Sequence, residues 1–253
     1  MMDSRTGRWT LAILAHVALI AAWYLFVHLG NVPKFVMPSP EATLNALLQP
    51  NYSWWTNIAV TGTEIFGGYL LALVIGVALA LVFTWSKMLE AFFMPLLVSL
   101  NMIPKVALGP LIIVWFKYGV LPNSIMAFSI AVFPILLTTA RGLREIEPEL
   151  LDLVRSLKGS RWQLFTKIQL PGALPYIFSG MKVAAILAVA GAVVGEFLGS
   201  DKGLGYLMLQ VQVTLDTPAM FMAVLIITLL GMLLYGLVLI LERLLVVKDA
   251  RVV

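Results

Sequence analysis

RGLREIEPELLDLVRSLKGSRWQLFTKIQLP, the sequence from Arg141 to Pro171, is a polar segment in a chain that is otherwise largely apolar. The segments on either side of it are apolar enough to lie in lipid. We therefore expect the polar segment to lie in water, where another molecule can bind it. Its pattern predicts two short capped helices in succession, an unusual feature for one loop of a membrane protein.

The composition indicates a protein with several membrane spans. Of the 253 residues, 61% are hydrophobic and only 12% are charged, and the mean hydropathy is +0.97. A soluble domain has about a quarter of its residues charged. The absence of cysteine excludes disulfides and thiol catalysis. The basic residues are scattered through loops and form no stripe, so nucleic acid is not an expected partner.

Six apolar segments are long enough to cross a bilayer, since a spanning helix needs about 20 mostly apolar residues. The first follows Arg5 and Arg8 and could pass for a signal peptide, but it is long enough to span and no small-residue cleavage site closes it. We expect an uncleaved first helix, an all-α polytopic fold and a single transmembrane domain over residues 1–253. The expected spans are 9–29, 58–84, 90–116, 121–140, 176–199 and 219–242.

Positive residues predict the orientation, because short loops rich in Lys and Arg stay in the cytoplasm. With both termini cytoplasmic, 13 of the 17 Lys and Arg residues lie inside, and Lys34, Lys117 and Lys202 lie outside. Lys105 falls within a span. The opposite orientation would invert this balance, and an even number of spans agrees with two cytoplasmic termini.

A short helix is expected on the outer side after the first span. Ser39 suits the N-cap, Pro40 suits the first turn, and Glu41 lies at the positive end of the helix dipole. Trp54 and Trp55 follow at a position where aromatic residues commonly anchor a protein in the membrane interface, and anchoring is the role we expect of them.

The first loop helix is predicted by signals at both ends. Pro148 suits the first helical position and Gly159 supplies a stop. Acidic residues near the start and basic residues near the end complement the helix dipole. The acidic residues are Glu149 and Asp152, the basic ones Arg155 and Lys158, and the apolar stripe is Leu150, Leu151, Val154 and Leu157.

The second loop helix follows at once. Ser160 and Gln163 have the spacing of a capping box, and Pro171 is expected to end the helix. Its apolar face holds Trp162, Phe165 and Ile168. Helix physics alone leaves open whether the pair packs on the bundle, lies on the membrane or binds a partner.

Several motifs resemble the permeases of binding-protein-dependent ABC importers, in their nitrate, sulfonate and taurine branch. Those permeases carry a cytoplasmic loop with Glu-Ala-Ala, three residues, Gly, and then nine residues before Ile-x-Leu-Pro. Here Asp152-Leu153-Val154 stands at the Glu-Ala-Ala positions, and Ile168-Gln169-Leu170-Pro171 closes the loop. The resemblance covers nearly the whole chain, and its other marks are MPSP at 37–40, IPKVALGPL at 103–111, GEFLG at 195–199 and GLGY at 203–206.

The loop departs from the family pattern at one position. Lys158 stands where the family has glycine, and Gly159 comes one step later. Leu153 and Val154 replace the two alanines, so this face of the helix is bulkier. The departure implies a difference in how tightly the loop docks, or in which ATPase it accepts.

The resemblance implies the fold of a type I ABC importer permease in the cell inner membrane, with a coupling loop at about 141–175. It implies a translocation subunit without catalytic activity, cofactor or metal, which works with two cytoplasmic ATPase subunits, an extracytoplasmic solute-binding protein and a second permease copy. A homodimer is expected, and a heterodimer with a sister permease is the alternative. The expected ATPase-coupling residues are Glu149, Leu151, Asp152, Val154, Arg155, Lys158, Gly159, Ile168, Leu170 and Pro171.

Ionisable residues inside a span are costly and predict function. Lys105 follows Pro104 in the third expected span, where proline breaks a helix and frees carbonyl groups. Such breaks often line a transport pathway, and we expect that role here. The alternative is that Lys105 caps the freed carbonyls or extends to the interface.

Glu196 lies within Gly191-x-x-x-Gly195-x-x-x-Gly199, a spacing that lets helices approach closely. We expect helix packing from the glycines and an outer gate formed by Glu196, Gly203, Gly205 and Tyr206. Glu64 is expected to be interfacial only. Because acids and a base are both present, the sign of the solute stays open, and Lys105 slightly favours a small anionic solute, with an aromatic one as the other class.

Two other classes of protein are disfavoured. An intramembrane enzyme would need clustered Asp, His or Arg at one membrane face, and a secondary transporter would usually show an internal repeat. Neither feature is evident in the sequence. No Gly-x-x-x-x-Gly-Lys-[Ser/Thr] motif occurs either, so ATP must bind to another chain.

Overall fold

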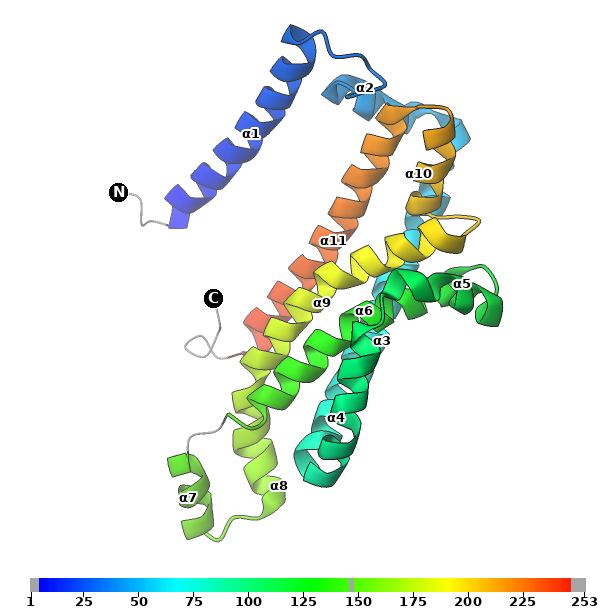
Figure 1. Cartoon of the computed structure of the whole chain (residues 1–253). Coiled ribbons are helices and arrows are strands. Elements are labelled where there is room, and N and C mark those ends of the chain that lie inside the picture. The colour runs from blue at the N-terminus through cyan, green and yellow to red at the C-terminus, as the bar shows by residue number, and fades with distance from the viewer. Residues whose placement is uncertain (1–4, 146–147, 247–253) are drawn as a thin grey trace.

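The computed structural model describes residues 5–145 and 148–246, and within them every regular element is helical. The helices lie along a tall, narrow bundle (Figure 1). In chain order they are α1 (Arg5–Leu29), α2 (Pro40–Asn45), α3 (Trp54–Trp85), α4 (Lys87–Met102), α5 (Lys105–Phe116), α6 (Val120–Gly142), α7 (Pro148–Ser156), α8 (Arg161–Leu164), α9 (Leu170–Gly199), α10 (Leu204–Val213) and α11 (Thr217–Leu245), with 3-10 turns at Ala46–Leu48 and Pro50–Tyr52 and a π turn at Phe165–Gln169.

The core is a layer of three helices in which α6 packs between α3 and α9. Small residues make this possible. A Cβ at Gly68 of α3 would lie 2.5 Å from Ala127 Cβ of α6, and a Cβ at Gly191 of α9 would lie 2.6 Å from Ala127 Cα. The prediction that the glycines of the Gly191 repeat serve close packing is therefore confirmed, since the helices approach almost to backbone contact.

Four of the six expected spans are long apolar helices, namely α3, α6, the run from Arg161 to Gly199, and α11. The third expected span is not one helix, because α4 and α5 meet at a 95° bend. Pro104 precedes the first residue of α5, and proline cannot donate the hydrogen bond that would continue α4. The first expected span corresponds to α1, whose apolar part is Ile13–Leu29.

Helix α1 stands apart from the other helices along most of its length (Figure 1). It is held at the end where the chain turns into α2. There the Trp23 indole donates a hydrogen bond to the Pro38 carbonyl oxygen at 3.0 Å, and its ring packs on Phe221 of α11. Most of the apolar surface of α1 is consequently exposed in a single copy of the chain.

The two ends of the bundle carry different elements. Helices α7 and α8 lie at one end, called here the loop end, and α2 and α10 lie at the other, called the cap end (Figure 1). The predicted start of α2 is confirmed, because the Ser39 hydroxyl accepts a hydrogen bond from the Ala42 N–H. The prediction for Trp54 was wrong. Its ring is buried and its indole binds the Ala46 carbonyl oxygen, whereas Trp55 is 85% exposed.

Candidate functional site

The loop that was expected to couple to an ATPase contains the two predicted helices. Helix α7 begins at Pro148, and α8 is capped by Ser160 with both hydrogen bonds of the capping box to Gln163. Between them, Lys158 adopts a left-handed backbone conformation with φ of +52°, and the Gly159 N–H binds the Val154 carbonyl oxygen. Lys158 thus takes the conformation that glycine adopts most readily.

The end of α8 differs from the prediction. Pro171 does not end a helix, because the chain passes through the π turn and continues directly into α9. Proline is tolerated there because it lies in the first turn of α9, where its missing N–H is not needed. The loop is thereby joined to a transmembrane helix by an almost unbroken helical connection.

The loop end exposes large apolar side chains. Leu153 is 53% exposed, Leu157 is 73% exposed and Trp162 is 65% exposed. Leu150 is 38% exposed, and these four exposed apolar side chains of α7, α8 and the turn between them are called here the loop ridge (Leu150, Leu153, Leu157 and Trp162). None of these four residues was among the expected coupling residues, although three of them had been assigned to the apolar faces of the loop helices. The spacing of Leu153 from Leu150 and Leu157 on a helix could have indicated Leu153 as well.

The residues that were expected to couple the loop to the ATPase differ in exposure. Glu149, Asp152, Lys158 and Pro171 are exposed, whereas Val154, Gly159, Ile168 and Leu170 are half-buried. The side chains of Leu151 and Arg155 lie outside the described part of the structure. Charged and apolar side chains are therefore both exposed on this loop.

Two contacts fix the loop to the bundle. The buried Phe165 ring packs between Trp162 and Trp85, with centroid distances of 5.7 and 5.5 Å. The Arg144 guanidinium forms an ion pair at 2.5 Å with Glu90 in the first turn of α4. The loop is thus attached to the end of α3 and to α4, in addition to its helical connection to α9.

At the cap end, side chains of α3 and α9 hold the start of α10. The Gly203 N–H donates to Asn57 Oδ1 at 2.8 Å, the Leu204 N–H donates to Thr61 Oγ1 at 2.8 Å, and the Gly205 N–H donates to Glu196 Oε2. Gly203 has a φ of +112°, a conformation that only glycine adopts easily. We call this group the α10 clamp (Asn57, Thr61, Glu196, Gly203 and Gly205).

The clamp changes how two acids are understood. Glu196 is 1% exposed and its carboxyl group faces α3 and α10 within one chain. Its role in an outer gate stays a prediction, and its hydrogen-bond partners are Thr61 of α3 and the start of α10. The expectation that Glu64 is interfacial was wrong, because Glu64 is fully buried and accepts a hydrogen bond from Asn123 Nδ2 at 2.8 Å.

The bend between α4 and α5 places Lys105 beside the end of α4. Lys105 Nζ donates to the Leu100 carbonyl oxygen at 3.0 Å, which is the capping contact that we considered as the alternative. The amine remains partly exposed. A pathway role for Pro104 and Lys105 therefore stays a prediction, compatible with a lysine that caps a helix and still reaches solvent.

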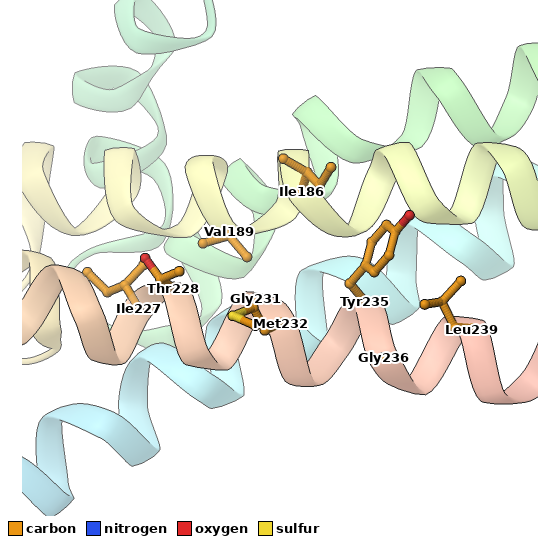
Figure 2. A pocket seen from close by; sticks show the side chains of 9 residues that line it. All are labelled: Ile186, Val189, Ile227, Thr228, Gly231, Met232, Tyr235, Gly236 and Leu239. Carbon is orange, nitrogen blue, oxygen red and sulfur yellow. The ribbon is translucent and has the colours of Figure 1, made fainter. Parts of the chain in front are cut away.

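A groove of about 590 Å³ runs along the outer surface between α9 and α11 (Figure 2). Its lining is almost entirely apolar apart from the hydroxyl groups of Thr228 and Tyr235, and the Thr228 hydroxyl already donates to the Val224 carbonyl oxygen. The groove thus offers little to a polar solute. Its lining residues are Ile186, Val189, Ile227, Thr228, Gly231, Met232, Tyr235, Gly236 and Leu239.

Comparison with known proteins identifies relatives across most of the chain. Residues 45–247 match the family described as binding-protein-dependent transport system inner membrane component. A probable ABC transporter permease protein of Haemophilus influenzae is 36% identical and covers 86% of this chain and 89% of its own length. The riboflavin transport system permease protein RibX of Chloroflexus aurantiacus is also 36% identical, and the match covers 92% of this chain and 87% of RibX.

A solved structure has the same arrangement of helices. The chain matches a structure of the MetNI methionine ABC transporter in inward-facing conformations with a TM-score of 0.57, covering 74% of this chain and 97% of the other. At 18% identity this similarity concerns the fold alone.

Proposed function

Because the chain belongs to the family of binding-protein-dependent transport system inner membrane components, we propose that it forms half of the translocation pathway of an ATP-driven importer. Members are non-catalytic permease subunits of the inner membrane, and they work with a separate ATPase and a solute-binding protein. We further propose that residues 1–253 act as one permease domain, with the loop end and both termini in the cytoplasm.

The observation that carries the proposal is the loop ridge. Exposed leucine and tryptophan side chains on a water-facing loop are costly unless a partner covers them. They occur together with exposed charged residues such as Asp152 and Lys158, a mixture typical of a protein interface. We propose that the ATPase covers the ridge, and that each of two permease copies binds one ATPase subunit.

The attachment of the loop supports transmission of movement to the pathway. A rigid element transmits a displacement, whereas a flexible loop absorbs it. The ring contact of Phe165 with Trp85 and the Arg144–Glu90 ion pair join the loop to α3 and α4. We infer that α4 moves with the loop, and that the corner at Pro104 changes its position when the ATPases close on ATP.

Co-purification tests the coupling proposal. Leu157→Glu should reduce the amount of ATPase recovered with the tagged permease at least tenfold, because a charge would be buried in the interface. Leu48→Glu is the matched control, since Leu48 is 79% exposed at the cap end and should leave recovery unchanged. Mass spectrometry of the eluate measures ATPase recovery for both variants. It also distinguishes a homodimer from a heterodimer, because a heterodimer would bring a second permease sequence into the eluate. Equal ATPase recovery with both variants would contradict the proposal.

Lys105 supplies a second test. Its amine lies at the bend, where a positive charge favours a small anion, and the similarity to a riboflavin permease makes an aromatic solute the other candidate class. We expect Lys105→Met to lower uptake severalfold while the assembled complex stays intact. Uptake by reconstituted vesicles measures this, with Lys87→Met, an exposed lysine, as the control. Unchanged uptake would remove Lys105 from the pathway.

A further inference from the structure

The first N–H groups of α10 are directed at side chains of other helices. Helix N-termini leave such donors without partners inside the helix. Asn57 and Thr61 accept from the first two. Glu196 accepts from the next two, Gly205 and Tyr206, and also from the Thr61 hydroxyl at 2.5 Å. Glu196 therefore receives three donors, an environment that suits an ionised carboxylate.

Glu64 has the opposite environment. Its Oε1 accepts from Asn123, whereas its Oε2 is buried without a donor among the described residues. Its side chain lies beside Glu196. Thr61, one turn earlier on α3, donates to Glu196. Asn123, which donates to Glu64, lies 2.8 Å from a Cβ built at Gly195. A buried carboxyl oxygen that lacks a donor, in a side chain beside a second buried carboxylate, is expected to carry a proton itself, since it then becomes the donor.

The charge balance supports the same assignment. The partners of the two acids in the described structure are neutral groups, namely Thr61, Asn123 and backbone N–H groups. The further charge that acts on Glu64 is Asp201, which is also an acid. Two adjacent buried carboxylates with no cation beside them would repel each other strongly, and one shared proton removes this cost.

We propose that Glu64 is protonated in the folded protein and donates a hydrogen bond from Oε2 to Glu196. Glu64 is then a positioning residue, because it holds the carboxylate that caps α10. Helix α10 and its GLGY turn form part of the cap end, so the pair sets the geometry of the outer end of the pathway. This last step rests on the proposed importer function, whereas the proton assignment does not.

Infrared spectroscopy of the purified full-length protein tests whether Glu64 is protonated. The wild type should show the carbonyl stretch of a protonated carboxylic acid at neutral pH, and Glu64→Gln should remove it. Glu41→Gln is the control, because Glu41 is exposed and a hydrogen bond from the Ser39 side chain lowers its pKa, so it is ionised. Absence of the band in the wild type, or its persistence in Glu64→Gln, would overturn the proposal.

A pair of amide substitutions tests the positions of donor and acceptor. Glu64→Gln should keep the thermal midpoint within about 2 °C of wild type, because the amide Nε2–H replaces the carboxyl proton. Glu196→Gln should lower it by about 5 °C or more, because an amide cannot accept from all three donors. The reverse order would place the proton on Glu196 and overturn the assignment.

Uptake measurements separate this inference from the proposed function. Glu64→Gln should transport like wild type, and Glu64→Met, which offers neither donor nor acceptor, should transport severalfold less. If the infrared band and the stability order are as expected but wild-type vesicles accumulate no solute with ATPase and binding protein present, the importer proposal fails and the proton assignment stands. If Glu64→Met transports like wild type, Glu64 is not a positioning residue.

Discussion

Replacement of Lys182 by methionine should destabilise the folded protein by about 3–5 kcal/mol, the usual cost of removing one partner of a buried ion pair. Lys182 Nζ of α9 lies 3.1 Å from Glu242 Oε1 in the last turn of α11. The Glu242 side chain is only 7% exposed, so the variant leaves a carboxylate away from water. The pair connects two helices through residues that are 60 positions apart in sequence.

The thermal midpoint of the purified protein measures this effect. Lys87→Met removes the same charge from an exposed lysine and should change the midpoint by no more than the error of the measurement. Exchange of the two charges in Lys182→Glu with Glu242→Lys should recover part of the loss, because the attraction is restored. A Lys182→Met midpoint equal to that of Lys87→Met would show that Glu242 is solvated or neutralised in another way.

Substitution of Gly191 should cause the next largest loss of folding stability. A Cβ at this position would lie 2.6 Å from Ala127 Cα and 3.1 Å from Ala127 N, and these are backbone atoms that cannot rotate away. We expect Gly191→Ala to cost about 1–3 kcal/mol, because α6 and α9 must separate, and Gly191→Val to prevent recovery of folded protein.

Gly236 of α11 provides a matched control within the same kind of helix. Nothing lies within 4 Å of a Cβ at Gly236, so Gly236→Ala should be neutral or stabilising by up to about 1 kcal/mol, the helix propensity difference. The yield of folded protein and its thermal midpoint check both variants. Equal losses at Gly191 and Gly236 would mean that glycine is needed for helix flexibility and not for close packing.

Much of the loop end could be predicted from residues close together in sequence. Pro148 and the Ser160–Gln163 capping box marked helix starts that the structure confirms. The loop ridge was only partly recognised, and the π turn after α8 was missed. Pro171 suggested an end, but an end also depends on whether the preceding carbonyl groups find other partners, which proline alone does not show.

The contacts of the buried charges could not be predicted from residues close together in sequence. Glu64 contacts Asn123 and Glu196, which lie 59 and more than 100 residues away, and its own neighbours in sequence suggested an interfacial position. Trp54 was misjudged for the same reason, since its ring belongs to a buried cluster with Leu204 of α10 and Met222 of α11. The burial and the partners of each of these side chains depend on the helix that packs against it.

The amino-acid sequence alone was sufficient for the membrane class, the family, the helix starts and the small residues of the packed faces. These features depend on total hydrophobicity and on hydrogen bonds within one turn of a helix, so nearby residues carry the information. The break before α5 follows from Pro104 itself, whereas the packed bundle determined its 95° angle, the Lys182–Glu242 pair and the pairing of Glu64 with Glu196. A buried charge is stable only with a partner at the right distance, and that distance exists only after separate helices have packed together.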